Sequence, residues 1–594
     1  MLQKKRLELL KTAVTKRDLA DILNINISFL TRTLYVNNIE GYYTSFEINK
    51  RSGGTRIINA PSDELKEIQV RLSDLLLDCI DALNKDKQIQ SKLSHGFSRD
   101  CSIITNAALH RNKKNVLNID LKDFFDCFNF GRVRGFFIKN KDFELHEDIA
   151  TVIAKIACYK NALPQGSPCS PVISNLITHS LDIRLVKLAQ RNSATYSRYA
   201  DDITFSTRKP AFSKYLVKEI DGNSCAGKKL NNEITRAGFE INDKKTRVQF
   251  KDSRQDVTGL IVNKKINTKS EYWRTARAMC HELFKSGKYV KKETVIDENG
   301  EKSVVVRQGT LRELEGILSF IDSVDKFNHL LKRPVKRNES NKVKSGRFFD
   351  HLNVREKTYS KFLFFNNFYS NSQPTVICEG KTDNVYLKSA ISQLYKEFPA
   401  LGGLSEESKK YRPNVHFMNL NNKTKYLMDL GGGASFFKRF MEHYEKDFER
   451  FKAPLSASPV ILLLDNDDGP KELLNLLASK KFKNCPNQVN AIREKSYLHL
   501  IKNVYLVLTP LVNGNSSAME DFFDKVTLGK KVGGKPFNPK NDMDNKTHYG
   551  KHVFSIKVVR ENKANISFDL FKPILKAISD VMEHYNKNVK PTLK

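Results

Sequence analysis

Acidic residues at the ends of two β-prone segments are the first candidates for chemistry. Asp120 ends the run VLNID, and the adjacent pair Asp201 and Asp202 follows SRYA. Carboxylates brought together from separate strands repel one another, so their proximity is favourable when divalent cations bind between them. Two Mg²⁺ ions about 4 Å apart can activate an attacking hydroxyl and stabilise a leaving pyrophosphate. Successive strand residues face opposite sides, so we expect Asp201 to be the more direct ligand unless a tight turn after Ala200 relaxes that constraint. Taken alone, each aspartate is also compatible with an ordinary strand end.

A second acidic group lies in the last third of the chain. Glu379 directly follows the run TVIC, and Asp465 and Asp467 follow the run PVILLL. The carboxyl ends of parallel strands are where ligands collect, so these acids can converge. Asp465 and Asp467 can face one cation while Asn466 points away. The spacing predicts a second Mg²⁺ site, although so short a pattern also arises by chance.

The charge balance points to a polyanionic partner. The 594 residues include 100 Lys and Arg against 67 Asp and Glu, a net charge of +33, which nucleic acid would offset. The chain has no apolar run of about 18 residues and its N-terminal stretch is charged, which predicts a cytoplasmic protein with no membrane partner. Nine dispersed cysteines without CxxC spacing argue against disulfides and against a cysteine zinc site.

The hydropathy pattern predicts two architectures. Residues 115–206 mix β-prone and helical runs, which is typical of an α+β core. Residues 272–332 are patterned as helices around a β-hairpin at 293–307, with an Asn-Gly pair as its turn. After a predicted break at 371–375, strands and helices alternate and one strand is nearly all apolar, which indicates a parallel sheet covered on both faces.

Four motifs, in this order, resemble those of reverse transcriptases. They are motif A (IDLKDFF), motif B (LPQGSPCSP), the catalytic box (YADD) and the lysine-bearing motif (GFEINDKKT). The resemblance implies an α+β right-hand polymerase, with fingers and palm over about 1–265 and a helical thumb over about 266–372. It implies that Asp120, Asp201 and Asp202 bind two Mg²⁺ and catalyse RNA-directed DNA synthesis from dNTPs.

The resemblance also implies a nucleotide-binding set. Its members are Arg51, Arg56, Phe125, Gln165, Gly166 and Lys244, with Lys245 as the alternative to Lys244. The ring at the fifth position after the first aspartate would exclude a 2′-hydroxyl by volume, unless it is a core phenylalanine. The two arginines flank a glycine pair and resemble a fingers hairpin that meets the triphosphate, although a basic solvated loop has the same composition.

Two further patches resemble signatures of retron reverse transcriptases. NAALH fits their NAxxH motif, and VTG fits their VTG motif. The resemblance implies a cytoplasmic bacterial enzyme that copies its cognate structured noncoding RNA into RNA-linked single-stranded DNA, which stays bound. The residues expected to contact RNA are Asn106, His110, Val257, Thr258, Gly259 and Trp273. Trp273 is equally compatible with a core position.

The C-terminal region, residues 373–594, resembles a TOPRIM domain of the overcoming-lysogenization-defect nucleases, followed by an extension. The resemblance implies that Glu379 is a general acid/base or metal ligand, and that Asp465 and Asp467 bind one or two Mg²⁺. Asp383 and Glu520 resemble the supporting acids.

The whole chain is therefore expected to be a retron reverse transcriptase fused to an α/β TOPRIM effector with a parallel sheet. The effector would cleave DNA or RNA in antiphage defence, and the chain is a candidate for homo-oligomer formation. The alternatives are a TOPRIM part that only holds the nucleic-acid product, and a polymerase from a mobile or diversity-generating element.

Overall fold

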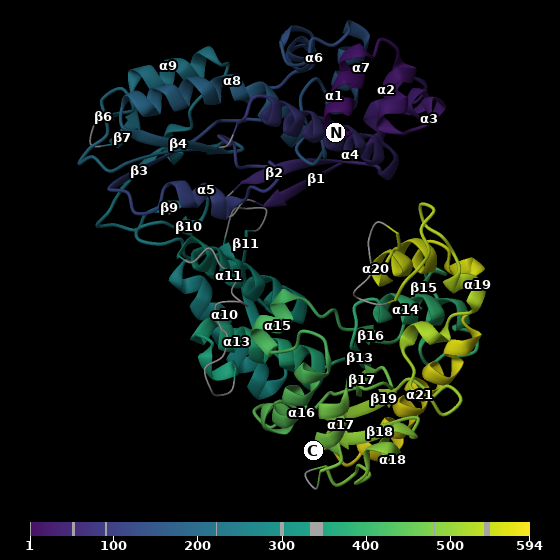
Figure 1. Cartoon of the computed structure of the whole chain (residues 1–594). Coiled ribbons are helices and arrows are strands. Elements are labelled where there is room, and N and C mark those ends of the chain that lie inside the picture. Colours follow the sequence, from purple (N-terminus) through teal and green to yellow (C-terminus); the bar gives the residue numbers. More distant parts are fainter. Residues whose placement is uncertain are drawn as a thin grey trace. The chain divides into compact units, whose positions relative to one another are not determined.

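The computed structural model describes residues 2–49, 54–89, 92–220, 223–296, 302–332, 348–479, 482–539 and 547–593. The chain divides into two compact units (Figure 1). One unit consists of Met1–Tyr272 and Glu293–Val305, and the other consists of Trp273–Lys292 and Val306–Lys594. Among the described residues, no helix has the length and apolar character needed to cross a membrane.

Several helices of the first unit begin at local capping signals. In α2, Thr15 and Asp18 form a capping box, and α5 begins with a second box between Ser102 and Thr105, which satisfies N–H groups that a helix start leaves unpaired. The helices of this unit are α1 (Leu2–Thr12), α2 (Lys16–Leu23), α3 (Ile27–Thr31), α4 (Asp63–Asp86), α5 (Ile103–Leu109), α6 (Phe130–Lys139), α7 (Glu147–Ala157), α8 (Ser170–Arg191) and α9 (Lys228–Arg236).

A four-stranded antiparallel sheet with the order β4-β5-β3-β8 forms the centre of this unit. Helix α8 packs on β4 and on α9 (Figure 1). The strands of the unit are β1 (Tyr43–Asn49), β2 (Thr55–Pro61), β3 (Asn115–Asp120), β4 (Ala194–Tyr199), β5 (Asp202–Thr207), β6 (Val217–Ile220), β7 (Asn223–Ala226), β8 (Arg247–Phe250), β9 (Asp256–Val257) and β10 (Leu260–Ile261). Strands β1 and β2 pair as a separate antiparallel hairpin.

The second unit is built on a five-stranded sheet with the order β16-β13-β17-β19-β18. The first four strands pair in parallel, and β18 pairs antiparallel at the edge. Strands β11 (Val290–Ile296) and β12 (Lys302–Gln308) each have residues in both units. The other strands of this unit are β13 (Thr375–Cys378), β14 (Gly402–Leu404), β15 (Tyr411–Pro413), β16 (His416–Phe417), β17 (Val460–Leu464), β18 (Leu498–Ile501) and β19 (Val504–Leu508).

Strand β17 is buried along its whole length because both faces of the sheet are covered. Val460, Leu462 and Leu464 belong to one apolar core, whereas Ile461 and Leu463 belong to the other, as the two-residue period of a strand requires. The helices are α10 (Ser270–Ser286), α11 (Leu311–Lys332), α13 (Val354–Phe364), α14 (Asp383–Leu394), α15 (Asn422–Met428), α16 (Ala434–Phe448), α17 (Lys471–Leu477), α18 (Val489–Arg493), α19 (Lys525–Leu528), α20 (Lys551–Val553) and α21 (Lys572–His584).

The segment expected to be a thumb shares a core with this sheet. Ala276 of α10, Leu314 of α11 and Phe362 of α13 lie in the same apolar cluster as Leu462 of β17. The compact units therefore divide near residue 272, and not at the predicted break near 372. Strands β11 and β12 form the predicted hairpin, and its Asn-Gly turn lies outside the described residues.

Candidate active sites

The fold brings the first three acids to one edge of the antiparallel sheet. Asp120 at the end of β3 is the register partner of Asp202 at the start of β5. Tyr199 also pairs with Asp202, so Ala200 and Asp201 form a two-residue turn, in which Ala200 has a φ of +55°. The Leu121 N–H donates to the Asp201 carbonyl oxygen at 3.0 Å and ties the turn to the residue after Asp120. The turn is the feature that lets adjacent aspartates approach one site.

These carboxylates lie close enough to affect each other's ionisation. Burial, and then the nearby Asp120, raise the pKa of Asp201. Asp202 is exposed to the open cleft, but the surrounding protein still desolvates its carboxyl group. This desolvation, and then the nearby Asp201 and Asp120, raise the pKa of Asp202 to about 7. Lys245 Nζ lies 3.0 Å from both Asp120 carboxylate oxygens, and Asn242 Nδ2 donates to Asp120 Oδ1 at 3.2 Å.

The donor set suits a hard divalent cation, since it consists of carboxylate oxygens. In the described part of the chain, no three His, Cys, Asp or Glu side chains already have the arrangement of a metal site. At Asp120 the Lys245 ammonium takes the place beside the carboxylate where a cation would lie. We infer that Asp120, Asp201 and Asp202 fit Mg²⁺, because their oxygens are suitable ligands and because a positive charge already lies beside Asp120.

The acids line a cleft of about 1350 Å³. Three predicted nucleotide-binding residues, Arg56, Phe125 and Gln165, also line it. Lys245 lines the cleft and Lys244 is not among its lining residues, so the structure favours the second of the two lysines. Arg51 lies outside the described residues.

Gly166 acts through its backbone. Its φ is +124°, and a Cβ added there would lie 2.7 Å from the carbonyl oxygen of Asn59 on β2. The Asn59 N–H donates to the Gln165 carbonyl oxygen at 2.8 Å. A glycine therefore lets this loop pack directly on the β1–β2 hairpin and places Gln165 in the cleft.

The second acidic group gathers at the carboxyl edge of the parallel sheet. Glu379 follows β13 and Asp465 follows β17, as predicted. Asp383 is buried at the start of α14 and accepts from the Gly380 N–H at 2.8 Å. Glu520 is buried in the short 3-10 helix Met519–Phe522, and the neighbouring Met519 N–H donates to Asp465 Oδ1 at 2.9 Å.

Burial and mutual proximity raise the pKa values of acids in this cluster. Burial, and then Asp383, Glu520 and Glu379, raise the pKa of Asp465 to about 8. Burial, and then Asp467 and Asp383, raise the pKa of Glu379, whose Oε2 is buried without a hydrogen-bond partner. Such a group of carboxylates is unfavourable unless a cation compensates it.

Lys551 of α20 is a member of the cluster that the sequence reasoning missed. Its Nζ lies 3.0 Å from Glu520 Oε2. Asp465 and Asp383 also act on it and, with Glu520, outweigh burial and raise its pKa. Lys551 lies 31 residues after Glu520 within an irregular basic segment, so no local pattern could have identified it.

The comparisons with known proteins concern mainly the first unit. A family model described as reverse transcriptase (RNA-dependent DNA polymerase) matches residues 48–263. A solved apo telomerase from Candida tropicalis, truncated from its C-terminal domain, is 15% identical over 40% of this chain and 56% of that chain. Its TM-score is 0.27, which adds nothing to the assignment. The Retron Mx65 reverse transcriptase of Myxococcus xanthus is 32% identical over 46% of this chain and 64% of that protein.

The decisive match is the Retron Ec86 reverse transcriptase of Escherichia coli. It is 31% identical over 339 residues, which cover 55% of this chain and 92% of that protein. The chain belongs to the retron reverse transcriptases. The second acidic cluster of this retron reverse transcriptase lies beyond residue 263, where the family model ends.

Two residues expected to contact RNA are instead part of the interior of this retron reverse transcriptase. Asn106 and His110 have no exposed surface. His110 Nδ1 bonds to Ser206 Oγ and its Nε2 to Ser197 Oγ, each at 2.7 Å, while Ser197 Oγ donates to Asn106 Oδ1 at 2.6 Å. The NAxxH motif therefore attaches helix α5 to strands β4 and β5, and the expected direct contact is wrong for these two side chains.

The VTG segment belongs to the same packing arrangement. Val257 is fully buried, and Thr258 Oγ1 donates to the Ile103 carbonyl oxygen of α5 at 3.2 Å. Thr258 has a φ of +46° and Gly259 a φ of +82°, so the segment makes the tight turn between β9 and β10. The buried Val257 side chain cannot reach RNA, whereas Thr258 and Gly259 stay predictions.

Trp273 packs against a core, which is the alternative to RNA contact that the sequence left open. It is partly buried against the apolar core of the second unit. The Arg355 guanidinium lies 5.6 Å from its ring centre, which is a cation–π distance. The ring therefore makes contacts within the protein, and its contact with RNA stays a prediction.

Proposed function

We propose that this retron reverse transcriptase polymerises DNA in the cleft around Asp120, Asp201 and Asp202. Its template would be a cognate structured noncoding RNA, and its product RNA-linked single-stranded DNA. The observation that carries the proposal is the single cleft that these acids share with Phe125 and Gln165. The net charge of +33 supports a nucleic-acid partner.

Each residue has a role that its position supports. Asp120, Asp201 and Asp202 would hold Mg²⁺, which when bound activates the attacking hydroxyl and stabilises the leaving pyrophosphate. Arg56 would bind the triphosphate from β2, and Phe125 would exclude a ribose 2′-hydroxyl by volume. The Lys245 ammonium, which now neutralises Asp120, would be free for a phosphate once a metal takes its place.

The test is DNA synthesis by purified Asp201→Ala and Asp202→Ala with the cognate RNA, dNTPs and Mg²⁺. We expect loss of synthesis with unchanged RNA affinity, because ligands are removed and the basic surface is not. Asp243→Ala is the control, since this aspartate belongs to the same unit, is exposed and does not line the cleft. Full synthesis by either variant would remove that aspartate from the catalytic set.

We propose a second activity, Mg²⁺-dependent nucleic-acid cleavage, at the acidic cluster of a TOPRIM-like effector domain. The proposal is supported by Glu379, Asp465 and Asp467 at the carboxyl ends of neighbouring parallel strands. Asp383 and Glu520 would support them. The rival is a non-catalytic platform that only holds the RNA–DNA product.

Glu379→Ala and Asp467→Ala separate these two possibilities. Both variants should lose cleavage of single- or double-stranded DNA or RNA and keep DNA synthesis, because the two sites share no residue. Asp468→Ala is the control, because Asp468 is adjacent to Asp467 but exposed. Cleavage that survives in both cluster variants would favour the platform.

A role in antiphage defence, a bacterial cytoplasmic location and a homo-oligomeric state stay predictions. Cells that carry the complete system should resist phage, and Glu379→Ala should abolish that resistance. Equal phage resistance in wild type and Glu379→Ala would show that the acidic cluster has no role in defence.

A further inference from the structure

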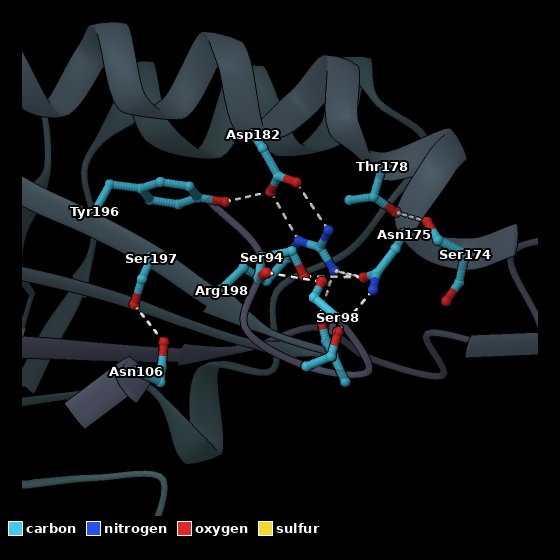
Figure 2. Close-up of polar contacts among 12 residues, drawn as sticks. Ser94, Ser98, Asn106, Ser174, Asn175, Thr178, Asp182, Tyr196, Ser197 and Arg198 are labelled. Carbon is cyan, nitrogen blue, oxygen red and sulfur yellow. Dashed lines mark hydrogen bonds and ion pairs between the residues drawn. The ribbon is translucent and has the colours of Figure 1, made fainter. Parts of the chain in front are cut away.

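A buried guanidinium lies directly behind the turn that carries Asp201. Arg198 is on β4, two residues before Ala200, and has no exposed surface. Its Nε donates to Asp182 Oδ1 at 2.7 Å, and its Nη2 donates to Asp182 Oδ2 at 2.8 Å. Figure 2 shows Asp182 reaching from its helix to this guanidinium. Because α8 carries Asp182, the ion pair joins the helix that follows motif B to the strand that leads into the turn.

The remaining nitrogen of Arg198 reaches the turn itself. Nη1 donates to the carbonyl oxygen of Ala200 at 3.0 Å and to Asn175 Oδ1 at 3.1 Å. Ala200 has a left-handed φ of +55°, which residues with a Cβ avoid unless neighbouring groups impose it. The Arg198 guanidinium therefore holds the carbonyl group of the residue that has the strained φ.

A second segment, the backbone of His95 and Gly96, contacts the end of β4 and the turn. The His95 N–H donates to the Arg198 carbonyl oxygen at 2.8 Å, and Asn175 Nδ2 donates to the Gly96 carbonyl oxygen at 2.7 Å. A Cβ added to Gly96 would lie 2.6 Å from the Ala200 nitrogen, so this backbone is in direct contact with the turn. Figure 2 shows Asn175 in contact with the guanidinium, and Ser94 Oγ from the neighbouring loop also donates to Asn175 Oδ1 at 2.9 Å.

Stability alone is a poor explanation for this network. A buried ion pair loses hydration that its attraction only partly recovers, and apolar residues of similar volume often replace such pairs without loss of stability. What apolar residues cannot supply is three donors in one plane, directed at Asp182, Asn175 and the Ala200 carbonyl.

We propose that Arg198, oriented by Asp182 and Asn175, is a positioning residue that fixes the Ala200–Asp202 turn in the geometry needed for nucleotide addition. The guanidinium touches no substrate in this role. It acts through the backbone, which sets where the Asp201 and Asp202 carboxylates stand relative to Asp120. The inference rests on the proposed catalytic role of these aspartates.

The first test replaces the network by apolar groups in the full-length protein. The triple variant Arg198→Met, Asp182→Leu, Tyr196→Phe removes the ion pair together with the tyrosine hydroxyl that donates to Asp182 at 2.6 Å. We expect kcat for dNTP addition to fall by about 100-fold, because small displacements of reacting groups have effects of that size. KM for dNTP and RNA affinity should stay near the wild-type values, and the Mg²⁺ concentration for half-maximal rate should rise. Tyr196→Phe alone keeps the Arg198 hydrogen bonds to Asp182, Asn175 and the Ala200 carbonyl, and it is the matched control, with a kcat near the wild-type value.

A second variant keeps the proposal testable if the triple variant does not fold. Gly96→Ala leaves the ion pair intact and pushes a methyl group against the Ala200 nitrogen, so it should give the same selective loss of kcat. Hydrogen exchange of peptides from β3 to β5 reports whether each variant is folded.

Two outcomes separate failure of this inference from failure of the proposed site. If Asp201→Ala abolishes synthesis while a folded triple variant keeps wild-type kcat, Arg198 does not position the turn. Wild-type kcat in Gly96→Ala would show that nucleotide addition does not depend on the geometry of the turn, and it would also overturn the proposal. If Asp201→Ala itself keeps synthesis, the site is misassigned and the proposal falls with it. A parallel loss of kcat, RNA affinity and exchange protection would show a structural role and would also overturn the proposal.

Discussion

The buried His110 makes the first unit sensitive to mild acid. Desolvation, and then the nearby Lys113 and His95, lower the pKa of His110 to about 3, against an ordinary value of about 6.5. Between about pH 3 and pH 6.5, His110 therefore binds a proton in the unfolded state that it does not bind in the folded state. Folding free energy from this residue is fully present above pH 6.5 and is lost as the pH falls below it.

The size of the effect follows from the distance between pH 5 and the ordinary pKa. That distance is about 1.5 pH units, which corresponds to about 2 kcal/mol at about 1.36 kcal/mol per unit. We expect wild type to lose about 2 kcal/mol more than His110→Gln when the pH falls from 7 to 5. A single unfolding curve would mix two compact units, so the measurement is amide hydrogen exchange of peptides from β4 and β5.

The control is His179→Gln, because His179 is exposed on α8. It should follow wild type at both pH values. An equal loss in wild type and His110→Gln would refute the desolvation argument. A second measurement addresses function: folded His110→Gln should bind RNA like wild type at pH 7, and a large loss of affinity would contradict a purely interior role for His110.

Three further predictions concern nucleotide selection, packing and charge. Phe125→Val should admit ribonucleotides, since the ring lines the cleft; unchanged discrimination between dNTP and rNTP in primer extension would show that the ring is only packing. Gly166→Ala should lower dNTP incorporation by about tenfold or more, because its Cβ meets the Asn59 carbonyl oxygen at 2.7 Å. Gly135→Ala, where a Cβ meets nothing within 4 Å, is its control in the same extension assay. RNA affinity should fall steeply with salt, by about 0.7 to 0.9 log units per log unit of salt for each phosphate contact, and a flat dependence measured by filter binding would contradict an electrostatic interface.

Local patterns in the sequence were sufficient for the motifs and for many elements. The run VLNID and the box YADD predicted acids at strand ends, and β3, which ends at Asp120, pairs with β5, which begins at Asp202. The uniformly apolar run at Val460–Leu464 predicted a strand covered on both faces, and its side chains alternate between two cores. Such features depend on the residue period and on turn chemistry, which neighbouring residues encode.

Tertiary packing decided the features that join distant segments. The sequence could not distinguish Lys244 from Lys245, because a short 3-10 helix at Asp243–Lys245 determines which side chain meets Asp120. Nor could it reveal that His110 is enclosed by Ser197 and Ser206 from two other strands.

The dependence on distant segments also explains the largest differences between the expected and the observed structure. Amphipathic periodicity identifies a buried face without naming the surface that covers it, so the helices expected to form a separate thumb proved to share a core with the C-terminal sheet. Asp182 and Arg198 look like ordinary charged positions in sequence, and only the packing of α8 on β4 removes both from water and makes them partners. The sequence by itself determined which chemistry-bearing residues exist and where their strands end, whereas the tertiary structure alone determined which of them are buried, because burial depends on contacts between segments far apart in the chain.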